Sequence, residues 1–275
     1  MLMQRVITAA ILAPAVIGAI LFLPTWATSS IFGVFLVIGV LEWNKLAGMQ
    51  PPLSRVIALI FAGLAIGLYM ALQNPEVRVF CFVIAVATWL LITAFVISTQ
   101  HTGKTSLHSL PGRIFNGPLA CLVILLGAFA STVELLKFDP AILLLLFVAV
   151  WAADAGAYFT GKALGKRKLA VNISPGKTWE GVIGGLVLSA LVMAAGVQLL
   201  LLSDAQKHAL IALGVVAVCF SVVGDLFESI LKRHGRFKDS GNLLPGHGGA
   251  LDRVDGLIAA VSIFAAGYFL WVSKL

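Results

Sequence analysis

Nine long apolar runs dominate this sequence and decide its fold class. Each is close to the roughly 20 residues that a helix needs to cross the hydrocarbon of a bilayer. Barrel strands would instead alternate with a period of two, which the runs do not show. The chain is 60% hydrophobic over 275 residues, well above the roughly 45–50% of soluble domains. We therefore predict an all-α, polytopic integral membrane protein with about nine transmembrane helices, at 6–23, 26–41, 56–72, 77–97, 114–133, 141–159, 182–202, 209–227 and 256–272.

The positions of the lysines and arginines predict an orientation. If the N-terminus is cytoplasmic, only four of the 19 basic residues fall on the outer side, namely Arg78, Lys137, Lys207 and Lys274. Cytoplasmic loops of membrane proteins carry such an excess of positive charge. We therefore predict a cytoplasmic N-terminus and attribute the net charge of +7 to this rule, not to nucleic acid binding. We expect the first run to be retained as a membrane anchor, and the alternative is that it is a signal peptide that is cleaved.

The chain shows no repeat, low-complexity linker or soluble segment that would divide it. We predict a single membrane domain over 1–275, with N-terminal helices in 1–112 and the site carried by the helices and cytoplasmic loops of 113–275. The loops on the outer side are short, and the two longest cytoplasmic loops hold most of the polar residues. The working face is therefore predicted to be the cytoplasmic one.

Two pairs of carboxylates frame the longest cytoplasmic loop. Asp225 and Glu228 end the eighth run, and Asp252 and Asp255 begin the ninth. The i,i+3 spacing places each pair on one helical face, and the loop leaves and returns on the same side of the membrane. Crowded carboxylates repel unless a cation joins them, and Mg²⁺ prefers oxygen ligands beside phosphates. We predict that all four bind a metal ion, with solvated loop charges as the alternative.

The loop between these pairs concentrates cations and glycines. The cations can neutralise phosphate groups, and a glycine-rich turn around His247 can bring backbone N–H groups close to an anion. We expect His247 to donate a hydrogen bond rather than to act as a base. The site residues predicted in and beside this loop are Lys232, Arg233, Lys238, Asp239, Gly246, His247, Gly248, Gly249 and Arg253.

The preceding cytoplasmic loop predicts a second part of the anion site. We expect Ser174 to be a helix N-cap and Pro175 the first helical residue, so that free N–H groups and Lys177 face one anion. Glu180 lies one turn beyond Lys177. Gly176 to Thr178 does not form a Walker A loop, because the first glycine of that pattern would fall at Val171. A capped helix start without a ligand is the alternative.

Asp154 lies late in the sixth apolar run. An ionised carboxylate is costly in hydrocarbon, so this side chain is expected to face protein or water. Pairing inside the helix bundle and a functional role both stay open. Together these residues predict an enzyme or binder at the cytoplasmic membrane surface, with phosphorylated, magnesium-bound ligands.

The spacing S-x-L-K-R-x4-K-D-x5-P-G-H-G-G-x2-D-R-x-D, from Ser229 to Asp255, resembles the signature of phosphatidate cytidylyltransferases, also called CDP-diacylglycerol synthases. The segments 174–181 and 224–229 are similar to the same family. The resemblance implies a multi-pass enzyme of the bacterial inner membrane, with its active site facing the cytoplasm. It also implies that the enzyme joins CTP and phosphatidate to give CDP-diacylglycerol and pyrophosphate in phospholipid biosynthesis. It further implies a need for Mg²⁺, leaves a second cation open, and implies a homodimer.

This resemblance suggests roles for the predicted residues. Asp225, Asp252 and Asp255 would hold the metal ion. The lysines and arginines would neutralise the triphosphate and the lipid phosphate, and Ser174 and Lys177 would complete the pocket. The lipid phosphate would attack the α-phosphorus of CTP with metal assistance. Two alternatives stay open, a CTP-dependent polyprenol or phytol kinase and an anion transporter that uses Asp154.

Overall fold

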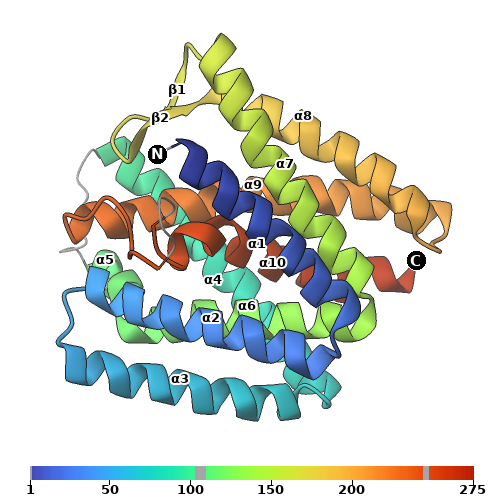
Figure 1. Cartoon of the computed structure of the whole chain (residues 1–275), viewed down its shortest axis with the longest axis horizontal. Helices are drawn as coiled ribbons and strands as arrows, with labels where there is room; N and C mark the ends of the chain where they lie inside the picture. Colours follow the sequence, from blue (N-terminus) through green and yellow to red (C-terminus); the bar gives the residue numbers. More distant parts are fainter. Residues whose placement is uncertain (1, 103–109, 244–247) are drawn as a thin grey trace.

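The computed structural model describes residues 2–102, 110–243 and 248–275, and within these residues the chain is helical apart from one short hairpin (Figure 1). The elements are α1 (Leu2–Phe22), α2 (Thr25–Leu46), α3 (Pro51–Ala71), α4 (Pro75–Thr102), α5 (Leu110–Asn116), α6 (Pro118–Phe138), α7 (Pro140–Leu164), β1 (Lys168–Ala170), β2 (Ser174–Thr178), α8 (Trp179–Gly196), α9 (Asp204–His234) and α10 (Leu251–Leu270), with 3-10 turns at Val197–Leu199 and Val272–Lys274.

Eight helices of the described part of the chain are long and apolar enough to cross a membrane, and α1 adds a shorter apolar stretch, Ala10–Phe22. The predicted all-α polytopic fold is therefore confirmed, with eight or nine spans. One boundary differs in an informative way. α9 runs for 31 residues, about 46 Å at 1.5 Å per residue, and carries Lys232 and Arg233 on its last turn. These two residues belong to a helix, not to a loop.

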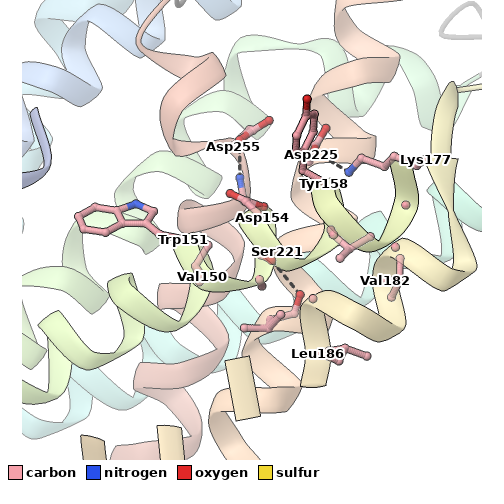
Figure 2. A pocket seen from close by; sticks show the side chains of 18 of the residues that line it. Val150, Trp151, Asp154, Tyr158, Lys177, Val182, Leu186, Ser221, Asp225 and Asp255 are labelled. Atoms are coloured by element: carbon pink, nitrogen blue, oxygen red, sulfur yellow. Dashed lines mark hydrogen bonds and ion pairs between the residues drawn. The ribbon is translucent and has the colours of Figure 1, made fainter. Parts of the chain in front are cut away.

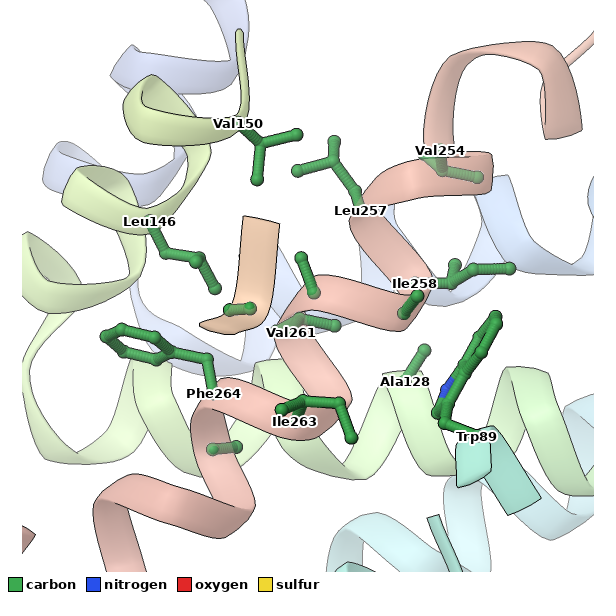
Figure 3. Packing of buried hydrophobic residues seen from close by; sticks show 14 of the residues in the cluster. Trp89, Ala128, Leu146, Val150, Val254, Leu257, Ile258, Val261, Ile263 and Phe264 are labelled. Atoms are coloured by element: carbon green, nitrogen blue, oxygen red, sulfur yellow. The ribbon is translucent and has the colours of Figure 1, made fainter. Parts of the chain in front are cut away.

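α10 lies at the centre of the helix bundle. It contacts α9, α6, α4 and α7, and its residues from Leu257 to Ala266 are almost all buried. Figure 3 shows its apolar side chains between α7, represented by Leu146 and Val150, and Trp89 of α4. By contrast, α3 and α8 expose large apolar side chains along much of their length, as helices facing lipid do. The N-terminus of α10 is thus fixed by the core and not by its loop.

α7 and α8 pack together unusually closely. A Cβ atom on Gly185 of α8 would lie 2.6 Å from the backbone oxygen of Ala153 on α7, and one on Gly156 would lie 2.9 Å from the backbone oxygen of Gly184. Small residues permit such backbone contact between membrane helices. Ala153 and Gly185 of this contact also line a cavity that the helix pair borders with α9 and α10.

The hairpin between α7 and α8 corrects one prediction. Ser174 was expected to cap a helix that begins at Pro175, but both residues lie in β2, which pairs antiparallel with β1 through Ala170 opposite Ser174. α8 begins only at Trp179, and the Thr178 hydroxyl accepts the cap hydrogen bond from the Gly181 N–H at 3.1 Å. The N-cap prediction is wrong because strand pairing holds these five residues extended and a second capping residue follows them.

Candidate active site

A cavity of about 580 Å³ lies between α7, β2, α8, α9 and α10. Its acidic lining residues are Asp154, Asp225, Asp252 and Asp255, and its basic ones are Lys162, Lys177 and Arg253. Apolar side chains line the same space, among them Trp151, Val182 and Leu186. Figure 2 shows Asp154, Asp225 and Asp255 directed to one region, with Leu186 farther away. The cavity therefore joins a charged part to an apolar part.

A close crossing of α9 and α10 brings the carboxylates of the two helices together. A Cβ atom on Gly224 would meet the backbone oxygen of Asp255, and one on Gly256 would lie 3.2 Å from the Cβ of Ser221. Only glycine allows backbones to come this near. Because Asp225 and Asp255 lie beside these contacts, their side chains reach the same cavity from two helices, as the sequence predicts.

Lys177 links the two predicted halves of the site. It reaches from β2 to Asp225 on α9, with 2.5 Å between the Lys177 Nζ and an Asp225 carboxylate oxygen. Both side chains stay accessible from the cavity, at 25% and 39% exposure. An ion pair this exposed stabilises a fold only weakly, by up to about 1 kcal/mol, so both groups are available to a ligand.

Lys232 has a different environment from the one that the sequence predicts. Its Nζ lies 2.5 Å from Glu228 and 2.7 Å from Asp252, and the two carboxylates are each only 5% exposed. Lys232 and Glu228 do not line the cavity. Removing one partner of such a buried group leaves an uncompensated charge, at a cost of about 3–5 kcal/mol. In this structure Lys232 joins α9 to α10, and a contact with phosphate stays a prediction.

Asp252 organises the return of the loop into α10. Its Oδ2 accepts hydrogen bonds from the Ser240 N–H at 2.8 Å, the Ser240 hydroxyl at 2.9 Å and the Gly249 N–H at 2.8 Å. Gly248 has φ of +81°, and a Cβ there would lie 2.5 Å from Asp252 Oδ2. The anion that these glycines approach is thus a carboxylate of the protein itself. A role of Gly248 and Gly249 in substrate binding stays a prediction.

Glu42 of α2 was not predicted as part of this region. Its buried carboxylate accepts hydrogen bonds from the backbone N–H groups of Ala250 at 3.0 Å and Leu251 at 2.9 Å, and it shares the single Ser240 hydroxyl proton with Asp252, each at 2.9 Å. Ala250 offers no side-chain cap to α10, so Glu42 supplies the cap from another helix. The only signal in the sequence is an acidic residue directly after an apolar run, which does not reveal its partners.

The other predicted residues lie away from the cavity or outside the described residues. Arg233, Lys238 and Asp239 are exposed and do not line the cavity. Glu180 accepts hydrogen bonds from the backbone N–H groups of Lys166 and Arg167. Gly246 and His247 lie outside the described residues. For all of these a role in binding or catalysis stays a prediction.

α7 contributes two charged residues and a tyrosine to the lining of the cavity. Asp154, whose role the sequence left open, lines the cavity, and so does Lys162, which was not predicted as a site residue. Tyr158 lies between them in the sequence and also lines the cavity. The spacing 154, 158, 162 places all three on one helical face, and this pattern could have identified Lys162 from the sequence.

The carboxylates fit a magnesium ion that is shared with a ligand. Within the described residues, no three histidine, cysteine, aspartate or glutamate side chains gather closely enough to enclose a metal ion. Lys232 contacts Glu228 and Asp252, whereas Asp225, Asp252 and Asp255 line the cavity, and metal binding by all four carboxylates stays a prediction. Mg²⁺, however, is usually held by one or two carboxylates together with substrate phosphates. Asp225 and Asp255 meet that need.

Fold and cavity together define a class of protein, a polytopic membrane protein with a cavity suited to an anionic and partly apolar ligand. Residues 3–271 match the model of the Cytidylyltransferase family. The chain is 41% identical to the phosphatidate cytidylyltransferase of Pseudomonas aeruginosa, over 99% of this chain and 98% of that protein. It is 36% identical to the phosphatidate cytidylyltransferase of Haemophilus influenzae, over 98% of this chain and 99% of that protein. The chain therefore belongs to the phosphatidate cytidylyltransferase family.

We predict that Glu42→Gln destabilises the protein by about 2 kcal/mol, since a buried charge-assisted acceptor of three hydrogen bonds is replaced by an amide whose NH₂ group faces donors. Thermal unfolding in detergent measures the change. The matched control is Glu76→Gln, an exposed glutamate in the first turn of α4, which should unfold within a degree or two of the unmodified protein. Equal midpoints for the two variants would contradict the capping role of Glu42.

Proposed function

We propose that the cavity between α7, α8, α9 and α10 is the site at which this enzyme transfers the cytidylyl group of CTP to phosphatidate. The products are CDP-diacylglycerol and pyrophosphate, the reaction of its family in phospholipid biosynthesis. The assignment to this cavity rests on one observation. Charged and apolar side chains line the same space. A nucleoside triphosphate needs the charged part, and a lipid with a phosphate headgroup needs both.

The reaction is a substitution at the α-phosphorus of CTP. An oxygen of the phosphatidate phosphate forms a bond to this phosphorus while the bond to the departing pyrophosphate breaks. The attacking phosphate is already anionic near neutral pH, so no general base is required. The barrier comes from charge repulsion and alignment. Fixed cations lower it, and the cavity offers Lys177, Arg253 and Lys162 for this purpose.

Asp225 and Asp255 are the residues that would hold Mg²⁺ together with the phosphates of the substrates. The ion would supply neutralisation of the charge that develops on the phosphate oxygens. Asp154, in the same cavity, keeps this region negative and so favours cation binding before the anionic substrates arrive. Asp252, held by Lys232, would act mainly by fixing the first turn of α10.

We infer that the cavity faces the cytoplasm of a bacterial inner membrane. CTP is a cytoplasmic nucleotide, and the counted excess of lysine and arginine places the hairpin and the Ser229 to Asp255 segment on that side. The domain assignment over 1–275 and the homodimer stay predictions.

The identity of the products separates this function from its alternatives. Purified protein incubated with CTP labelled at the α-phosphorus, phosphatidate and Mg²⁺ should transfer the label to the lipid phase, with one pyrophosphate released per lipid labelled. Release of labelled CDP without lipid labelling would indicate a CTP-dependent lipid kinase instead. Anion counterflow in liposomes without lipid labelling would indicate a transporter.

We predict that Asp225→Asn lowers kcat/KM for CTP by at least about 100-fold. The cavity loses a carboxylate that would hold the cation, and the cation would reduce the repulsion between the phosphates of the two substrates. The unfolding temperature of this variant should stay within a few degrees, since the ion pair with Lys177 is partly exposed. Asp204→Asn, the same change in the first turn of the same helix, is the control and should keep activity within about twofold. Near-normal turnover of Asp225→Asn at low Mg²⁺ would refute the assignment.

A further inference from the structure

Basic side chains gather where α7 ends and the hairpin begins, with Lys162 at the edge of the cavity and the others outside it. Lys162, Lys166, Arg167 and Lys168 are all exposed. None of them forms an ion pair with any residue that the structure describes. The next acidic residue after them in the sequence, Glu180, directs its carboxylate to the backbone N–H groups of Lys166 and Arg167 instead. The local positive charge is therefore available to an external anion.

The backbone beneath these side chains is anchored at several points. The Glu180 carboxylate lies 3.1 Å from the N–H groups of both Lys166 and Arg167, and the Trp179 N–H donates to the Arg167 oxygen at 2.9 Å. At the tip of the hairpin, the Asn172 side chain donates to the Gln100 backbone oxygen of α4 at 2.7 Å. These hydrogen bonds therefore hold the backbone that carries the basic residues in a defined position.

The same segments also expose large apolar side chains. Tyr158 is 61% exposed, Phe159 67%, Leu164 63% and Trp179 52%. They lie where the spans of α7 and α8 end, the depth at which aromatic side chains meet lipid headgroups. The Lys162 ammonium lies 5.8 Å from the centre of the Tyr158 ring. We call these eight residues, Tyr158, Phe159, Lys162, Leu164, Lys166, Arg167, Lys168 and Trp179, the basic–aromatic surface.

The basic–aromatic surface is continuous with the cavity. Tyr158 and Lys162 line the cavity and also belong to the surface. A ligand bound at the basic–aromatic surface would therefore reach the charged part of the cavity without first binding at another site. The apolar side chains beside the cations favour a ligand with acyl chains over a hydrophilic nucleotide. The cations without an ion-pair partner among the described residues favour an anionic headgroup over a zwitterionic one.

We propose that the basic–aromatic surface binds anionic phospholipid from the adjoining leaflet and passes phosphatidate to the cavity. The inference rests on the proposed function for the identity of the lipid that reacts. The surface itself would select negative charge at the headgroup together with apolar chains. It would raise the local concentration of phosphatidate, and apart from Lys162, which also lines the cavity, its residues would take no part in the chemical step.

Surface-dilution kinetics in mixed micelles test the delivery role. In the double variant Lys166→Gln with Lys168→Gln, the mole fraction of phosphatidate at half-maximal velocity should rise by about five- to thirtyfold, since each cation beside an anionic surface contributes about a fivefold preference. The KM for CTP should stay within twofold. The control is Lys207→Gln with Lys274→Gln, which removes the same charge elsewhere. An unchanged lipid dependence, or a rise in the KM for CTP instead, overturns the proposal.

Lipid binding can be measured without any turnover. In nanodiscs of phosphatidylcholine, a small fraction of phosphatidate brominated in its acyl chains should quench the fluorescence of Trp179, obtained as the difference from Trp179→Phe. Brominated phosphatidylcholine at the same fraction should quench severalfold less, and the lysine double variant should lose the preference. Equal quenching by both lipids would overturn the proposal. So would the absence of quenching because another copy of the chain covers the surface. This readout stands even if the enzyme proves to use another lipid acceptor.

Discussion

The partly buried ammonium of Lys232, held between Glu228 and Asp252, fixes the relation of α9 to α10. Such a triad is costly to break, because neither lipid nor a dry protein interior can solvate the charges left behind. Asp252 extends the network to Ser240 and Gly249, and Glu42 of α2 extends it to the first residues of α10. α2 is thereby held to the consecutive helices α9 and α10, which are distant from it in the sequence, through carboxylates at one end of the bundle.

This arrangement divides the charged residues into two groups with different tasks. Glu42, Glu228, Lys232 and Asp252 engage one another or backbone N–H groups, and they hold the framework. Asp225, Asp255, Lys177 and Arg253 line the cavity, and the only ion pair among them is partly exposed. A framework held by its own ion pairs and hydrogen bonds can present the second group in a fixed geometry, which is what electrostatic catalysis of phosphoryl chemistry requires. The apolar lining from α7 and α8 then gives the same cavity access to a lipid.

The sequence predicts those features that depend on periodicity or on local spacing. Apolar length predicted the helices, and the return of the loop to the same side predicted that Asp225 and Asp255 lie near one another, although Glu228, the i,i+3 partner of Asp225, does not line the cavity. It could not assign Glu42, because the partners of that carboxylate are about 200 residues away. It misplaced Ser174 because a serine before a proline fits a helix cap and a strand equally well, and pairing with β1 decides between them. It also treated Lys232 as a phosphate ligand, since charge alone does not show that two buried carboxylates already surround it.

The central claim is that one cavity receives both the nucleotide phosphates and the lipid. Photo-crosslinking with phosphatidate that carries a diazirine in its acyl chain, followed by peptide mapping, tests it most directly. The account predicts labelling of the apolar lining of α7 and α8, around Trp151, Val182 and Leu186. Unlabelled phosphatidate should suppress this labelling, whereas phosphatidylcholine should not. Specific, competed labelling confined to α3 or α4 would show that the lipid binds elsewhere and would contradict the account.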